Sequence, residues 1–194
     1  MSVHKSGFPL CSKPAGDFCV SYIGKRFLAE CFEPVARQDA RVLVLGSVPG
    51  EASIAAGKYY AHPRNAFWPL MEHLLGNGAP LEYRARVDLI LSARIALWDV
   101  LASAARIGSL DAAIVTESEV PNDVAGFLDA HPCVESVFFN GAKAEESFRR
   151  HHRDLLTRRG IKAARLPSTS PAYATVSFQG KVAAWRVVID AAGE

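Results

Sequence analysis

The sequence lacks the features that define several classes of protein. Its 194 residues contain no low-complexity tract and 49% are apolar, so the chain is neither disordered nor fibrous. No apolar stretch approaches the ~20 residues that cross a bilayer. Residues 1–18 hold no continuous apolar segment and include Pro9 and Pro14, which argues against a secretory signal peptide. We therefore expect a cytoplasmic, globular protein that is not associated with membranes.

The cysteines do not form a recognisable metal or disulfide pattern. Cys11, Cys19, Cys31 and Cys133 include no CxxC pair and no compact run, which zinc and iron–sulfur sites typically show. We expect structural thiols in a reducing compartment and no bound metal.

Several short enzyme motifs are also absent. Gly50 and Gly57-Lys58 are too far apart for a phosphate-binding Walker loop, and Tyr59 follows where Ser or Thr is needed. The sequence contains no GxGxxG dinucleotide fingerprint after its first apolar strand, no GxSxG nucleophile elbow and no zinc-deaminase signature. Nucleotide-dependent and serine-nucleophile chemistry are therefore not indicated.

The chain has no large excess of positive or negative charge, since 22 basic and 20 acidic residues leave a net charge of +2. A basic run between Arg149 and Arg165 is the exception, with Asp154 as its acidic residue. Such a run can contact phosphates. The simpler alternative is a solvated helix face.

Alternating apolar and amphipathic segments predict an α/β fold. Arg41–Leu45 is a β-branched and Leu-rich run bounded by glycine, which is typical of a central parallel strand. Three further strands are expected at 95–98, 134–139 and 161–166, and helices at 25–31, 65–75, 81–93, 121–130, 142–152 and 177–191. This order predicts one parallel sheet of four strands with helices on both faces.

Ligand sites of such sheets lie beyond the carboxyl ends of the strands, here in the loops 46–64, 99–108, 140–141 and 167–174. These loops carry polar and aromatic rather than mainly ionic side chains: Ser47, Tyr59, Tyr60, His62, Asn65, Phe67, Trp68, Asp99, Asn140, Ser168, Thr169 and Ser170. Aromatic rings can stack on a base, amides can read its edge, and small residues let the backbone approach a phosphodiester. The set suits a nucleobase flipped into a pocket.

Each of these residues also has a purely structural interpretation. Phe67 and Trp68 have the spacing of core residues, and Asn65 is a plausible helix cap. His62 and Asp99 could each make one loop hydrogen bond. Asn140-Gly141 and Pro167–Pro171 could be only turns.

Four segments together resemble the uracil-DNA glycosylase superfamily, and within it the hypoxanthine-DNA (DNA-deoxyinosine) glycosylase branch. They are LGSVPGEASIAAGKYYAHPRNAFWPLM (Leu45–Met71), IALWDVLASAARIGSLDAAI (Ile95–Ile114), FFNGAKA (Phe138–Ala144) and LPSTSPAYA (Leu166–Ala174). The resemblance covers roughly residues 33–190. It implies a three-layer α/β/α sandwich around a four-stranded parallel sheet, with no cofactor or metal. Residues 33–194 then form a single glycosylase domain, and residues 1–32 an N-terminal extension of unknown role.

The resemblance also implies residue roles, with two departures from the wider superfamily. Ser47 stands where many members carry a water-positioning Asp or Asn, and Leu166 stands where others have His or Asn. Asn65 is then the expected catalytic residue, with Ser47 beside it. The expected base pocket comprises Gly46, Tyr60, His62, Phe67, Asp99 and Asn140. The expected contacts to the DNA backbone, and the wedge that fills the duplex, comprise Pro49, Gly50, Ser168, Thr169, Ser170 and Tyr173.

The implied function is a monofunctional, monomeric DNA glycosylase that acts in base-excision repair on double- or single-stranded DNA. The deaminated bases that it would remove are hypoxanthine and, as a second candidate, uracil. Two alternatives stay open: a non-catalytic nucleic-acid-binding protein of the same fold, and a small-molecule N-glycoside hydrolase. The sequence leaves the preferred base undecided, because one pocket contact worth ~1–3 kcal/mol can determine it.

Overall fold

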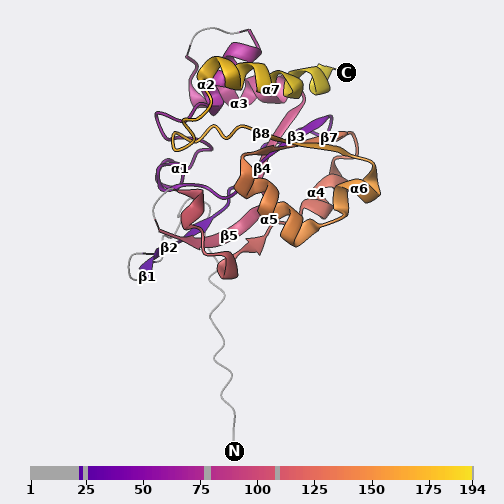
Figure 1. Ribbon diagram of the computed structural model, residues 1–194. Coiled ribbons are helices and arrows are strands. Elements are labelled where there is room, and N and C mark those ends of the chain that lie inside the picture. Colours follow the sequence, from indigo (N-terminus) through magenta and orange to yellow (C-terminus); the bar gives the residue numbers. More distant parts are fainter. Residues whose placement is uncertain (1–21, 24–25, 77–79, 108–109, 194) are drawn as a thin grey trace, which may run out of the picture.

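A parallel sheet of four strands forms the centre of the protein (Figure 1). The computed structural model describes residues 22–23, 26–76, 80–107 and 110–193. The strands lie in the order β4-β3-β7-β8. Their bounds are β3 (Val42–Gly46), β4 (Ile95–Asp99), β7 (Ser136–Asn140) and β8 (Lys162–Leu166). The four predicted parallel strands are confirmed.

The central strand β3 is buried on both faces, as its apolar sequence predicts. Successive side chains of a strand point to opposite faces. Val42 and Val44 therefore join one core with helices α2 (Phe67–Leu74), α3 (Tyr83–Ser92) and α7 (Phe178–Gly193). Leu43 and Leu45 join a second core with α4 (Val124–Ala130), α5 (Ala142–His152) and α6 (Leu155–Arg159).

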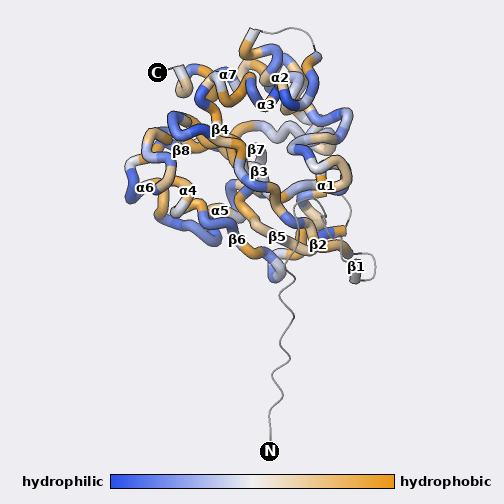
Figure 2. The backbone as a smooth tube through the Cα atoms, turned by 180° about the vertical axis from the view of Figure 1, so that it is seen from behind, coloured by the Kyte–Doolittle hydropathy of each residue, from blue (hydrophilic) through white to orange (hydrophobic). Residues whose placement is uncertain are grey.

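The two cores give the predicted three-layer α/β/α sandwich. Figure 1 shows α2, α3 and α7 grouped on one side of the sheet and α4, α5 and α6 on the other. Figure 2 shows hydrophobic segments in the central strands and hydrophilic segments along α5. No helix in the described ranges is long and apolar enough to cross a membrane.

A second, antiparallel sheet was not expected from the sequence. It has the order β1-β2-β5-β6, with β1 (Tyr22–Ile23), β2 (Arg26–Glu30), β5 (Leu101–Arg106) and β6 (Val120–Pro121). The predicted helix at 25–31 is therefore wrong across residues 26–30. Phe27 and Ala29 alternate into the core, and β2 pairs with β5. Part of the expected N-terminal extension thus packs on the domain, while Cys11 and Cys19 lie outside the described residues.

Two further segments differ from the sequence-based expectation. The predicted loop 46–64 contains the short helix α1 (Glu51–Ala56), which buries Ser53 and Ile54. The helix expected from residue 121 begins instead at Val124, because Asp123 caps it by accepting the Gly126 N–H at 2.9 Å. Pro121 pairs with Leu101 in β6.

Several residues of the basic run form ion pairs with acidic residues of the fold. Glu119, whose side chain is fully covered, accepts hydrogen bonds from Lys143 (2.6 Å), Arg150 (2.9 Å) and His151 (2.9 Å) of α5. Elsewhere Arg149 pairs with Glu145 at 2.8 Å, and Arg159 with Asp129 at 2.7 Å. These contacts favour the interpretation of the run as a paired helix face rather than as the main phosphate contact.

Replacing Glu119 by Gln should destabilise the protein in a pH-dependent way. Burial alone would raise the pKa of Glu119, but the hydrogen bonds from Lys143, His151 and Arg150 lower it to about 2. A carboxylate with a depressed pKa stabilises the fold above its unfolded pKa of about 4.3, and this stability is lost as the pH falls towards 2. We expect E119Q to lower the free energy of unfolding by about 1–3 kcal/mol at neutral pH.

Urea unfolding checks this, with the exposed Glu117→Gln as the matched control. The deficit of E119Q should shrink as the pH falls from about 5 towards 2, as the linkage relation requires. A deficit that is the same at all pH values would contradict the role assigned to the charge.

Candidate functional site

A cavity of about 340 Å³ opens at the carboxyl ends of the parallel strands. Gly46, Asp99 and Asn140, the last residues of β3, β4 and β7, all line it. Its volume is at the lower end of the ~300–1,000 Å³ typical of small-molecule pockets. The site therefore lies where a parallel α/β sheet is expected to bind a ligand, and its size suits a compact planar molecule.

The structure brings most of the predicted site residues together around this cavity. The predicted residues that line it are Gly46, Ser47, Pro49, Gly50, Tyr60, His62, Asn65, Asp99, Asn140, Ser168, Thr169 and Ser170. Phe67 does not line it and is fully buried behind Tyr60. Tyr173 lies outside the cavity beside a neighbouring hollow, with 39% of its surface exposed. Trp68 is a core residue, as expected.

Reciprocal hydrogen bonds join β7 to the loop after β8. The Asn140 Nδ2 group donates to Thr169 Oγ1 at 2.9 Å, and the Thr169 N–H donates to Asn140 Oδ1 at 2.9 Å. The Thr169 carbonyl then accepts the Ala66 N–H at 2.9 Å. Thr169 is fully buried, so this chain of bonds fixes the start of α2 against the end of β7.

Asn65 lies at the wall of the cavity, two residues before the first residue of α2. The N-cap of α2 is Ala66 and not Asn65 as expected, but Asn65 Oδ1 accepts the Phe67 N–H at 3.0 Å just before the helix. The same side chain lines the cavity. An amide oxygen has a second lone pair and the amide nitrogen has two protons, so Asn65 can bind a ligand or water without releasing the Phe67 N–H.

Tyr60 is held in an unusual conformation at the wall of the cavity. Its backbone φ of 53° lies in the left-handed region, which residues other than glycine rarely adopt. Its ring lies 4.2 Å from the ring of Phe67, at an angle of 31°. Phe67 covers one face of Tyr60, which leaves the face towards the cavity for a ligand. The Tyr60 hydroxyl is buried, and none of the described residues forms a hydrogen bond with it by distance and angle.

Asp99 is the most deeply buried acidic group of the cavity, with 3% of its surface exposed. Burial raises the pKa of Asp99 to about 7, against the lowering effect of the Cys31 thiol, which lies 3.7 Å from Oδ2. The negative charge of Asp111 raises this pKa further, and the positive charge of Arg106 opposes it. Asp99 therefore exchanges a proton near neutral pH.

Sequence reasoning missed a second buried polar residue that lines the cavity, Arg106. Arg106, with 1% of its surface exposed, donates to the carbonyls of Val48 and Pro49 at 3.3 Å and lies 3.8 Å from Asp111. Asp111 in turn accepts a 2.9 Å hydrogen bond from the Ser47 hydroxyl. Ser47 is thus tied to the short helix η1 (Asp111–Ala113). No signal pointed to Arg106, because its strand β5 was interpreted as a loop.

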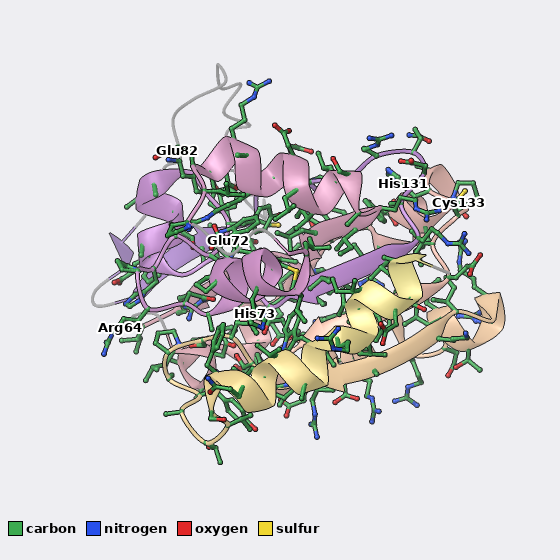
Figure 3. The ribbon with its side chains drawn as sticks, turned by 90° about the horizontal axis from the view of Figure 1, so that it is seen from above. Arg64, Glu72, His73, Glu82, His131 and Cys133 are labelled. Atoms are coloured by element: carbon green, nitrogen blue, oxygen red, sulfur yellow. The ribbon has the colours of Figure 1, made fainter. Side chains whose placement is uncertain are left out.

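A cation at the rim was also missed. Arg64 lines the cavity, and its side chain is exposed. Figure 3 shows it extending away from the body of the protein. Its backbone N–H donates to His62 Nδ1 at 3.1 Å. Among the described residues no group of three or more His, Cys, Asp or Glu side chains is arranged to hold a metal.

The fold agrees with a comparison to solved structures, and the sequence matches a known family. The model of the family described as the uracil DNA glycosylase superfamily matches residues 33–189. The chain belongs to this superfamily.

Individual relatives are similar over most of the chain. A protein of Methanosarcina acetivorans named hypoxanthine DNA glycosylase is 34% identical over 158 residues, which is 81% of this chain and 95% of that protein. A protein of the same name from Methanosarcina barkeri is 35% identical over 116 residues, 59% of this chain and 72% of that protein. A solution NMR structure of a protein from Methanosarcina acetivorans matches with a TM-score of 0.73 at 31% identity, covering 86% of this chain and 99% of that one.

Replacing Gly46 by Ala should disrupt the floor of the cavity. A Cβ at position 46 would collide with Asp99 Oδ1 and come within 3.0 Å of the Tyr60 hydroxyl. Overpacking of this kind typically costs about 1–3 kcal/mol. We expect G46A to unfold at lower urea concentration than wild type, whereas Gly193→Ala, whose Cβ would meet no atom within 4 Å, should not. Equal midpoints of urea unfolding for G46A and wild type would contradict the close approach of Asp99 Oδ1 to position 46.

Proposed function

We propose that this protein is a monofunctional DNA glycosylase that hydrolyses the N-glycosidic bond of deoxyinosine and releases hypoxanthine. The observation that carries the proposal is the cavity itself, which the predicted polar residues line together with Tyr60, whose ring is backed by Phe67. Membership of the uracil DNA glycosylase superfamily and the two relatives named hypoxanthine DNA glycosylase support it. We infer that it acts as a monomer in the cytoplasm.

The flipped base would stack on Tyr60. The ring is backed by Phe67 and fixed in the left-handed conformation, so it offers a rigid apolar wall. Offset stacking on such a ring contributes about 1–3 kcal/mol per base. Extruding a nucleotide costs a few kcal/mol, and least where the base is mispaired. The free energy gained by stacking therefore offsets the cost of extrusion best for a deaminated base, because such a base pairs poorly with the base opposite it.

Backbone and hydroxyl groups around the mouth would hold the DNA strand. Pro49 and Gly50 on one side, and Ser168 and Ser170 on the other, border the cavity. Small residues let the protein backbone approach phosphates closely. The exposed Arg64 supplies a positive charge at the same rim. Tyr173 lies beside the exposed Leu110, where the two apolar side chains could fill the gap left in a duplex.

Asn65 would orient the attacking water. The bond to the base breaks through a transition state resembling an oxocarbenium ion, as in glycoside hydrolysis. An oxocarbenium-like carbon is reactive enough for neutral water to attack it. A neutral amide that holds the water in place is therefore sufficient for catalysis of this step. The hydrogen bond from the Phe67 N–H holds Asn65 Oδ1 in place, which reduces the reorganisation needed at the moment of attack.

Single-turnover cleavage of a deoxyinosine duplex tests the proposal. We expect wild type to produce abasic sites opposite each partner base and none in an undamaged duplex. Asn65→Ala should lower the rate by about 10²–10⁴-fold, the usual loss for a group that positions or activates water. Asn65→Asp, which keeps the oxygen that accepts the Phe67 N–H, should fold as wild type and separates catalysis from the loss of this hydrogen bond.

Duplex affinity distinguishes an enzyme from a binding protein. We expect N65A to bind the deoxyinosine duplex within a few-fold of wild type. Specific duplex binding by wild type with no abasic sites on any duplex or single strand would instead favour the non-catalytic alternative.

A further inference from the structure

When the N-glycosidic bond breaks, a purine can be protonated at a ring nitrogen that a pyrimidine does not have. A purine nucleoside keeps a basic lone pair on N7, so protonating N7 lets the base leave as a neutral molecule. A general acid that protonates a leaving group typically contributes 10²–10⁴-fold in rate. A site that acts on deoxyinosine therefore gains most from a proton donor at the edge of the base.

Most polar groups of the cavity are poor proton donors. The Asn140 amide is bonded to Thr169 on both of its atoms. His62 accepts the Arg64 N–H at Nδ1, so this ring nitrogen is engaged as an acceptor. Asp111 accepts the Ser47 hydroxyl at 2.9 Å and lies 3.8 Å from the guanidinium of Arg106, so its carboxyl group already has two partners.

Asp99 has the opposite surroundings. Its Oδ2 faces the Cys31 thiol at 3.7 Å, and no ion pair to its carboxyl group is found within the described ranges. Its Oδ1 lies against Gly46, where the absence of a side chain leaves it beside the Tyr60 hydroxyl and the cavity. A proton on Oδ1 is therefore presented at the end of the ring on which the base would stack.

We propose that the Asp99 carboxyl, protonated on Oδ1, is the general acid that donates its proton to N7 of the departing hypoxanthine. This inference rests on the proposed function. The bond between C1′ and N9 breaks, and its electron pair stays on the base. The Asp99 proton moves to N7, so hypoxanthine leaves as a neutral molecule. Water adds its oxygen to C1′, and the proton that it loses restores the Asp99 carboxyl.

The groups around Asp99 allow this proton to be present at neutral pH. Burial raises the pKa of Asp99 to about 7, and Asp111 raises it further while Cys31 and Arg106 oppose the change. Burial also raises the pKa values of Cys31, Tyr59 and Tyr60, so these three neighbours stay neutral. An acid that must be protonated works below its pKa. Excision should therefore be constant below about pH 7 and fall about tenfold per pH unit above it.

The test measures single-turnover release of hypoxanthine from a deoxyinosine duplex between about pH 5 and about pH 9, a range that spans the titration. Asp99→Asn keeps the shape of the side chain and removes the proton. We expect D99N to be about 10²–10⁴-fold slower at pH 6, to lack the decline above pH 7, and to bind the duplex within a few-fold of wild type. The matched control is Asp129→Asn at an exposed carboxyl paired with Arg159, which should behave as wild type.

A second substrate keeps the test independent of how D99N folds. 7-Deaza-2′-deoxyinosine lacks the N7 lone pair, so wild type should cleave it as slowly as D99N cleaves deoxyinosine, and without the decline above pH 7. A D99N rate close to wild type would overturn the proposal. So would a wild-type rate that rises through pH 7, because the carboxylate would then be the active form. Wild type that releases no hypoxanthine at any pH would instead overturn the proposed function.

Discussion

The paired hydrogen bonds between Asn140 and Thr169 hold the functional site together. Three segments that are distant in the sequence meet at this pair: the end of β7, the loop after β8 and, through the Thr169 carbonyl, the start of α2. Thr169 is fully buried, and an unpaired amide or hydroxyl there would cost about 1–3 kcal/mol. The arrangement therefore places Asn65 on the wall of the cavity as a consequence of folding rather than of ligand binding.

The floor of the cavity depends on a different constraint, the absence of a side chain at Gly46. Asp99 Oδ1 occupies the space that a Cβ would take, and the Tyr60 hydroxyl would lie only 3.0 Å from that Cβ. A carboxyl confined there loses most of its hydration, which raises its pKa to about 7. Packing at the end of one strand thus determines the protonation of the neighbouring strand's last residue. In the proposed reaction the same packing places this proton beside the stacking ring.

Much of this arrangement was predictable from the sequence. The apolar run Arg41–Leu45 indicated a strand buried on both faces, and the rule for parallel sheets placed the site in the loops that begin at Gly46, Asp99 and Asn140. The second sheet was not predictable in the same way, because β2 is short and its helical and strand patterns are equally plausible over five residues. Only pairing with β5 makes it a strand, and that contact is distant in sequence. Arg106 was missed for the same reason.

A structure of the protein with a duplex containing a non-hydrolysable deoxyinosine analogue tests the central claim most directly. The account predicts that the hypoxanthine ring lies in the cavity against Tyr60, with Asn65 near C1′ and N7 within hydrogen-bonding distance of Asp99 Oδ1. A base that remains stacked in the duplex while the cavity stays empty would contradict the assignment of this site. A base bound in the cavity with its N7 edge turned away from Asp99 would keep the site and contradict the proton transfer.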